Sequence, residues 1–257
     1  MRRASVVAKK AVPAVRPLTV ALAAAVVLAG CQDGDEDRQT RPPPPSEVTT
    51  TTRASETTVG GAGEVRRGSG TARTERREVA GFARVVVQTS ADVRVAVGGE
   101  PSVEVTTDDN LLELVTTEVS ANELVIGARG SYSTGIGVKV QVVARSLDGV
   151  AVNGSGDLVA DGVRASRFDA SIRGSGDLTA SGTADEVHLD VAGSGHARLA
   201  GLTAARVHVR VDGSGDAEVT ASHALDASVR GSGSVVYGGS PSSVASSVTG
   251  SGQVRRR

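Results

Sequence analysis

Large aromatic side chains are almost absent from this chain of 257 residues, which has two Phe, two Tyr and no Trp. A conventional globular core depends on such rings, because each of them buries about 150–250 Å². The apolar residues that the chain does contain are chiefly Val, Ala and Leu. Small and branched side chains of this kind suit a thin, layered core between β-sheets. The composition therefore favours an all-β protein.

Cysteine is also scarce, since Cys31 is the only one and a disulfide within the chain is excluded. It follows a basic start, "MRRASVVAKKAVPAVR", and an apolar run of 14 residues, "PLTVALAAAVVLAG". A membrane-spanning helix needs about 20 residues, so this run is typical of an export signal. The closing "LAGC" resembles the lipobox of bacterial lipoproteins. That resemblance implies cleavage before Cys31 and a membrane anchor of diacylglycerol and palmitate on this residue; the alternative is an ordinary signal peptide with an accidental cysteine.

A basic surface is missing from the part of the chain that follows the leader. The leader, residues 1–30, holds five of the 28 basic residues and no acidic one, which leaves 23 basic against 29 acidic residues and a net charge of −6. Nucleic-acid binding needs a basic face to neutralise phosphates. We therefore expect no nucleic-acid partner.

Residues 31–78 lack the apolar groups that a folded core needs. They contain "PPPP", "TTTT" and scattered charges. Such a segment cannot bury enough surface to offset the entropy of ordering it. The sequence thus predicts a lipoprotein signal peptide at 1–30, a lipidated cysteine and disordered tether at 31–78, and a folded head at 79–257.

The sequence Gly-Ser-Gly occurs six times in the second half of the head, at steps of 18 to 20 residues. The copies begin at Gly154, Gly174, Gly193, Gly213, Gly231 and Gly250. Apolar and polar residues alternate on both sides of each copy, which indicates half-buried strands. A fixed period in this range is typical of solenoids. We predict a parallel β-solenoid, or β-helix-like fold, with coils of about 19–20 residues, regular over 150–257 and less regular over 79–149.

Each Gly-Ser-Gly is predicted to be a bend between two strands of one coil. Counting through the bend places both glycines on the inward side and the serine on the outward side. An inward side chain at so sharp a corner would collide with the wall of its own coil, and glycine avoids this.

The entry "REVAGFARVVVQTSADVRVAVG", the segment "NELVIGA" and the units "VNGSGDL", "IRGSGDL" and "VAGSGHA" resemble a known family. This is the auto-transporter adhesin head GIN domain family, and the likeness covers roughly residues 79–254. The resemblance implies a β-solenoid head on an exported, often lipidated bacterial protein of unknown function. It supplies no established catalytic residues.

Two outward columns carry residues that bind metals in other proteins. The first could place a zinc ion on successive coils, or be a solvated face, and consists of Asp169, His188, His208 and Asp226. The second follows the bends and could hold calcium, or its side chains could bond the backbone of the bend; it consists of Asp157, Asp177 and Asp216, with His196 between them. We expect solvated or structural side chains in both columns, and no metal or other cofactor.

Two loops interrupt the repeat and each contains one tyrosine, Tyr132 in 127–137 and Tyr237 in 237–243. Loops on a rigid scaffold often bind ligands, although these could equally be plain connections. The motifs HExxH, GxSxG, Walker A and CxxC do not occur in the sequence.

These features predict a non-enzymatic binding or adhesion protein, lipid-anchored to the outer face of the bacterial cell membrane, with a protein or glycan ligand in the envelope. One alternative is an envelope enzyme that acts on polysaccharide, although the chain has few aromatic platforms. Another is a structural or sensing subunit that assembles through the edges of the solenoid.

Overall fold

The computed structural model describes residues 65–257, and every regular element within this range is a β-strand. The signal peptide predicted at 1–30 and the tether up to residue 64 lie outside the described residues. Among residues 65–257 we find no helix with the length and apolar character needed to cross a membrane.

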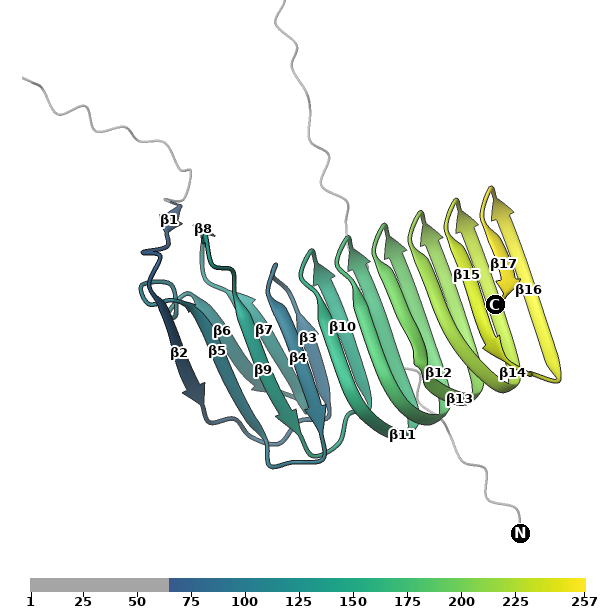
Figure 1. Ribbon diagram of the computed structural model, residues 1–257, viewed down its shortest axis with the longest axis horizontal. Coiled ribbons are helices and arrows are strands. Elements are labelled where there is room, and N and C mark those ends of the chain that lie inside the picture. The colour runs from purple at the N-terminus through teal and green to yellow at the C-terminus, as the bar shows by residue number, and fades with distance from the viewer. Residues whose placement is uncertain (1–64) are drawn as a thin grey trace, which may run out of the picture. The chain divides into compact units, whose positions relative to one another are not determined.

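Parallel strands stack coil upon coil in the second half of the chain (Figure 1). The strands are β10 (Gly149–Gly154), β11 (Leu158–Gly174), β12 (Leu178–Gly193), β13 (His196–Gly213), β14 (Asp216–Gly231), β15 (Ser234–Gly239), β16 (Ser243–Gly250) and β17 (Gln253–Arg256). Each long strand starts after one Gly-Ser-Gly corner, bends midway and ends at the next corner. Its first half belongs to the post-corner sheet and its second half to the pre-corner sheet, and the core lies between these two sheets. The predicted parallel β-solenoid is therefore confirmed.

The corners lie in register along the whole stack. Gly154 pairs with Gly174, Gly174 with Gly193, and Gly193 with Gly213, and the series continues through Gly231 to Gly250. The 18-to-20-residue period is thus the length of one coil. Differences in length are absorbed on the side opposite the corner, where register shifts occur, for example between Leu199 and Thr203.

The apolar columns face inward as the alternation predicts. Ile172, Val191 and Val211 are neighbours on successive coils, and each of them is at most 1% exposed. Phe168 is the largest fully buried side chain in the described range. One continuous core extends through the stack, because each coil buries its apolar column against the next.

The corners show that glycine is needed for contact between coils and not within one coil. A Cβ on Gly193 would press on the carbonyl oxygen of Gly174 in the preceding coil, and Gly193 has a φ of 129°. A Cβ on Gly195 would press on the carbonyl oxygen of Gly176 and lie 2.9 Å from the Cγ2 of Ile172. The expected collision with the same coil's wall is therefore wrong, and the neighbouring coil is the obstacle.

Backbone hydrogen bonds explain why adjacent corners approach so closely. The N–H groups of Ser194 and Gly195 both donate to the carbonyl oxygen of Gly174, over 3.0 and 3.3 Å. The same pair of bonds recurs at the next corner, where Ser214 and Gly215 donate to Gly193 over 3.0 Å each. The serine side chains stay exposed, and the outward position predicted for them is confirmed.

The first half of the described chain contains two more coils, stacked in an order that differs from the sequence. The strands are β3 (Arg84–Val87), β4 (Asp92–Val97), β5 (Ser102–Asp108), β6 (Val115–Ser120), β7 (Glu123–Ala128), β8 (Tyr132–Ser133) and β9 (Lys139–Ala144). β3 and β4 form one coil, and β7 and β9 form the other. The β3–β4 coil lies between the β7–β9 coil and the coil that begins with β10, because β3 pairs with both β7 and β10.

Antiparallel strands close this end of the stack. β6 runs antiparallel to β7, and β5 antiparallel to β9. The turn between β5 and β6 buries Leu111 and Leu112 over the end of the core. This end of the stack is therefore less regular than the coils that follow residue 150.

The head begins earlier than residue 79. Strands β1 (Arg66–Arg67) and β2 (Ala72–Arg77) both fall within the predicted tether, 31–78, and β2 pairs antiparallel with β5. The side chain of Arg77 donates to the carbonyl oxygens of Leu112 and Val115, over 2.8 and 2.6 Å. The predicted boundary at residue 79 is therefore too late. The residues of β2 are almost entirely exposed, so they lack the apolar alternation by which a strand is recognised in a sequence.

Asp108 connects the segments that pack over this end. Its carboxylate is fully buried and accepts hydrogen bonds from the backbone of Gly70 and the hydroxyl of Thr134, each 2.5 Å long. The hydrogen bond from Thr134 lowers the pKa of Asp108. The carboxylate therefore stays ionised and holds the loop after β1 and the loop after β8 on the end of β5.

Candidate functional site

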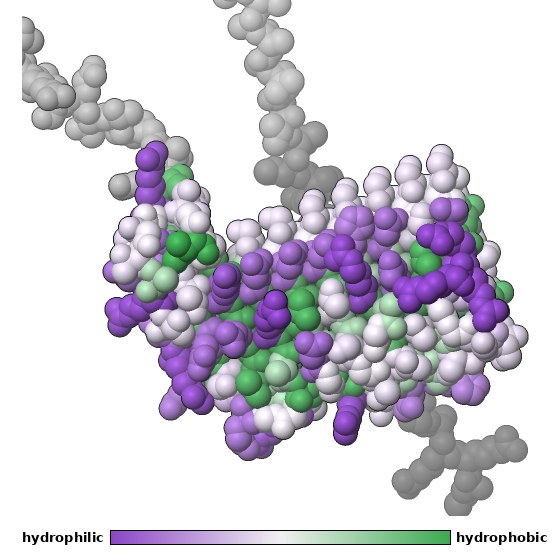
Figure 2. Space-filling view, in the orientation of Figure 1, coloured by the Kyte–Doolittle hydropathy of each residue, from purple (hydrophilic) through white to green (hydrophobic). Residues whose placement is uncertain are grey.

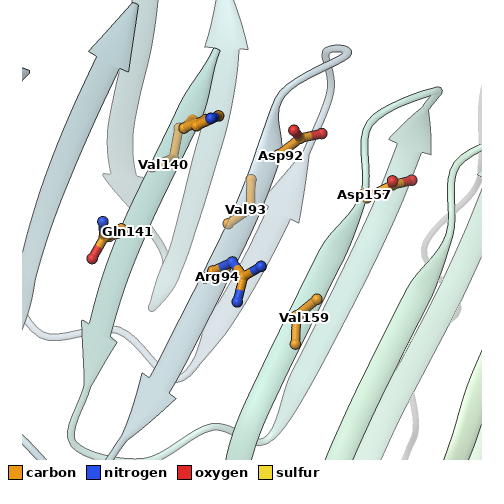
Figure 3. Close-up of a pocket in the computed structure, with 8 residues that line it drawn as sticks. Asp92, Val93, Arg94, Val140, Gln141, Asp157 and Val159 are labelled. Atoms are coloured by element: carbon orange, nitrogen blue, oxygen red, sulfur yellow. The ribbon is translucent and has the colours of Figure 1, made fainter. Parts of the chain in front are cut away.

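The outward surface of the post-corner sheet carries a charged groove of about 430 Å³ (Figure 3). Asp92 and Arg94 project from β4, Lys139 and Gln141 from β9, and Asp157 stands just before β11. All five side chains are exposed, because they occupy the outward positions of strands whose alternate residues are buried. The groove thus presents carboxylates, cations and an amide on three adjacent strands, together with the apolar side chains of Val93, Val140 and Val159. Lys139 is the only lysine outside the leader.

Sequence reasoning did not identify this groove as a site. Its residues come from β4, β9 and β11, which meet only because the β3–β4 coil lies between the β7–β9 and β10–β11 coils. Only Asp157 had been singled out, as part of the predicted calcium column. No local spacing in the sequence could reveal that strands 92–97 and 139–144 are neighbours.

A band of hydrophilic side chains runs along the post-corner sheet beneath the pale upper edge where the corners lie (Figure 2). The second predicted column stands at the start of the post-corner strands, and each of its aspartates accepts a hydrogen bond from the backbone of the next coil. Oδ1 of Asp157 accepts from the backbone N–H of Asp177 over 3.0 Å, and Oδ1 of Asp177 from that of His196 over 3.1 Å. Asp216 accepts from Ser234 over 2.8 Å in the same way. These bonds agree with the structural alternative to calcium, although they reach the next coil and not the aspartate's own bend.

The environment of Asp177 strengthens its structural role. Burial raises the pKa of this carboxyl, but hydrogen bonds from Arg198 and from the His196 backbone outweigh burial, and the pKa is lowered. The Nη1 of Arg198 lies 2.8 Å from Oδ2 of Asp177. Both carboxylate oxygens of Asp177 are therefore engaged by neighbouring protein groups.

The first predicted column lies on the outward face of the pre-corner sheet. The register pairs Asp169 with His188, His188 with His208, and His208 with Asp226, so the four residues do occupy one line across four coils. The imidazole rings of His188 and His208 lie 4.7 Å apart between centroids and are tilted by 31°. Asp169 at the start of the line is paired with Arg167 over 2.9 Å.

Glu186 is the residue of this cluster that sequence reasoning missed. It precedes His188 by two positions on β12, so both side chains emerge on the same face. Oε1 of Glu186 is hydrogen-bonded to Nε2 of His188 and lies 3.7 Å from Nε2 of His208. The hydrogen bond with His188 lowers the pKa of Glu186, and Arg206 acts in the same direction. The sequence "EVH" at 186–188 could have indicated this pair, because residues two positions apart on a strand share one face.

The two predicted tyrosines lie at the edges of the core. Tyr132 on β8 is half-buried, which raises the pKa of its hydroxyl, and it packs against the core cluster. Tyr237 on β15 occupies an inward position next to Val219 and also packs against the core. Much of each ring therefore serves packing. Cys31, the predicted lipidation site, lies outside the described residues.

The stacked parallel coils, their shared corner and the continuous core between two sheets define the chain as a β-solenoid protein. The chain belongs to the family described as "Putative auto-transporter adhesin, head GIN domain", whose model matches residues 81–241. The resemblance noted in the sequence is thereby confirmed. No curated protein matches the chain.

Solved structures share this fold. A protein from Bacteroides fragilis NCTC 9343, named a putative adhesin, is 23% identical with a TM-score of 0.63, and the alignment covers 74% of this chain and 99% of that one. A protein from Parabacteroides distasonis ATCC 8503, named a putative lipid binding protein, is 22% identical with a TM-score of 0.52, covering 76% and 100%. The family description and these names refer to adhesins and a lipid-binding protein and not to enzymes.

Proposed function

We propose that this chain is an exported, lipid-anchored binding protein whose solenoid head holds a glycan of the bacterial envelope in the groove of the post-corner sheet. The observation that carries the proposal is the charged groove itself. Sugar hydroxyls both donate and accept hydrogen bonds, and the groove offers acceptors on Asp92 and Asp157 and donors on Arg94, Lys139 and Gln141. Membership of an adhesin-type family supports a binding role at the cell surface.

Rigidity of the scaffold favours binding in this groove. The outward side chains stand on β4, β9 and β11, whose inward neighbours Val93, Val140 and Leu158 are each 1% exposed. A ligand would meet polar groups that are already positioned, and little ordering entropy would be lost on binding. The five polar groups extend across three adjacent strands, which is a wide platform for an extended ligand.

A glycan array probed with the detergent-solubilised full chain tests this function. We expect binding to a subset of glycans, reduced at least tenfold by Arg94→Ala and by Gln141→Ala. The control is Arg173→Ala, which removes an exposed arginine from the pre-corner sheet, outside the groove. Binding to no glycan, or equal loss with Arg173→Ala, would refute the proposal.

The same assay separates a binding protein from a polysaccharide-acting enzyme. Two carboxylates, Asp92 and Asp157, line the groove, and paired carboxylates cleave glycosidic bonds in many enzymes. We expect the bound glycans to keep their size when the products are analysed by mass spectrometry. Released fragments that disappear with Asp92→Asn would assign an enzyme instead.

The lipid anchor is a separate part of the proposal and is supported by the "LAGC" sequence ending at Cys31. Two or three acyl chains hold a protein on a membrane far more firmly than one, since each buried CH₂ contributes about 0.8 kcal/mol. We expect the wild-type protein to incorporate labelled palmitate and to enter the detergent phase on partition, and Cys31→Ser to lose the label. Unlabelled wild-type protein in the aqueous phase would show that Cys31 is not an anchor.

A further inference from the structure

We infer that Glu186, His188 and His208 form a binding site for a divalent transition metal, best matched by zinc, on the outward face of the pre-corner sheet. The site is independent of the groove described above, which lies on the other sheet. Among the described residues, this is the cluster in which three histidine or carboxylate ligand atoms lie within 4.8 Å of one another.

The solenoid register brings these ligands together. Glu186 and His188 share the outward face of β12, and His208 stands beside His188 on β13. Adjacent parallel strands lie about 4.8 Å apart, so side chains in one column come within reach of a single ion. Two neighbouring coils therefore supply all three ligands, and neither coil could do so alone.

The distances suit a tetrahedral ion after small movements. Zinc binds imidazole nitrogen and carboxylate oxygen at about 2.0–2.2 Å, which places neighbouring ligand atoms about 3.4 Å apart. Oε1 of Glu186 and Nε2 of His208 are 3.7 Å apart. Oε1 of Glu186 is closer to Nε2 of His188, with which it shares a hydrogen bond. Metal binding would replace that bond, and rotation of the Glu186 side chain would bring the two atoms to the spacing of neighbouring ligands.

The donor set points to zinc among the biological cations. Imidazole nitrogen suits zinc, copper and nickel, while calcium and magnesium require oxygen-rich sites. Two histidines and one carboxylate make three of the four ligands of a zinc ion and leave one position open. The side chains are 26%, 32% and 44% exposed for Glu186, His188 and His208, so an ion can reach them from solvent.

Asp226 lies near enough to support the proposed metal site from outside the three ligands. Oδ2 of Asp226 lies 3.9 Å from Nδ1 of His208, on the opposite side of the ring from Glu186. Metal-binding histidines usually present their second ring nitrogen to a carboxylate, which fixes the tautomer and orients the ring. At 3.9 Å the two groups are not hydrogen-bonded, but a small movement of the exposed Asp226 side chain would let it accept from Nδ1 and so orient Nε2 of His208 toward the proposed ion. A hollow of about 200 Å³ lined by His188, His208 and Asp226 gives space above these groups.

Arg206 opposes metal binding. One of its guanidinium nitrogens lies 3.5 Å from Oε2 of Glu186, the carboxylate oxygen that does not face the histidines. This contact positions Glu186 as a ligand through Oε1 alone, but its positive charge repels a cation. Removal of the positive charge of Arg206 should therefore tighten metal binding. If Arg206 and Glu186 formed only a structural ion pair, with no metal site beside it, this change would have no effect on zinc affinity.

Titration with zinc chloride tests the site on the full chain in detergent, with Cys31→Ser introduced so that the only cysteine cannot compete. We expect one zinc ion to bind per chain by competition with a chromophoric chelator. His188→Ala and His208→Ala should each weaken binding at least tenfold, and Asp226→Asn by about tenfold. Arg206→Gln should strengthen binding.

The chain contains its own matched control in His223, which is exposed and lies outside the cluster. His223→Ala should bind zinc with unchanged affinity, and circular dichroism should show that all the variants remain folded. Absence of zinc binding, equal weakening by His223→Ala, or unchanged affinity in both His188→Ala and His208→Ala would each overturn the inference. Calcium chloride should not bind in place of zinc, and preferential binding of calcium would also overturn it.

Discussion

Replacement of Gly193 by alanine tests why every corner of the solenoid is glycine. Gly193 has a φ of 129°, and an added Cβ would press on the carbonyl oxygen of Gly174 and lie 3.1 Å from the carbonyl carbon. A non-glycine residue in such a conformation costs about 1–3 kcal/mol. An atom forced into well-packed surroundings costs about 1–3 kcal/mol more. We therefore expect Gly193→Ala to lower the free energy of unfolding by about 2–6 kcal/mol.

Three further variants separate the two costs. Gly98 has a φ of 113° but nothing within 4 Å of an added Cβ, so Gly98→Ala should show the conformational cost alone, about 1–3 kcal/mol. Gly195 lacks the positive φ but has the backbone contact, so Gly195→Ala should show the packing cost alone. Ser194→Ala removes an exposed hydroxyl and should cost less than about 1 kcal/mol.

Urea unfolding of the full chain, followed by circular dichroism, measures these differences. Hydrogen exchange should also show that protection is lost first at the corners of adjacent coils, because coils of a solenoid contact mainly their neighbours. If Ser194→Ala destabilises the protein as much as Gly193→Ala, the serine side chain contributes to stability and the reasoning that treats it as solvent-exposed without a structural role is refuted. If Gly193→Ala is neutral, the close approach of the corners does not explain the glycines.

Phe168 is fully buried, so Phe168→Ala should destabilise the protein by about 3–5 kcal/mol in the same urea assay, whereas the outward Val159→Ala should change stability by less than about 0.5 kcal/mol. A small effect of Phe168→Ala would mean that the neighbouring coils collapse into the cavity. The lowered pKa of Asp177 means that its stabilisation is present above the unfolded-state pKa of about 3.9 and is lost as the pH falls through the lower folded-state pKa. Asp177→Asn should therefore flatten the fall in Tm below about pH 4, and an unchanged pH profile would exclude this contribution.

Much of the regular half could be read from the sequence because its determinants are local. Each Gly-Ser-Gly corner is flanked by alternating residues, and alternation fixes which side chains face the core. The length of one coil then predicts which residues become neighbours on successive coils. The sequence alone therefore predicts the column formed by Asp169, His188, His208 and Asp226. The serine's outward position followed from the same counting.

The orientation of the Glu186 side chain is an example of what the repeat period cannot predict. Its strand and its face were predictable, but the orientation of its carboxylate toward His208 depends on rotamers and on Arg206 in the next coil. Similarly, the aspartates after the corners were expected to bond their own bends. They bond the following coil because stacking brings its N–H groups within reach.

The sequence by itself determined the period of the coil, the inward and outward parity of its side chains, the all-β class and the family. These properties recur every 18 to 20 residues, so repetition makes them visible without knowledge of distant contacts. Only the tertiary structure decided that β3 lies between β7 and β10, that β2 extends the head before residue 79, and that the groove joins β4, β9 and β11. Those arrangements depend on pairing between segments that share no repeat, and the energy that selects them comes from burial between distant strands and not from local pattern.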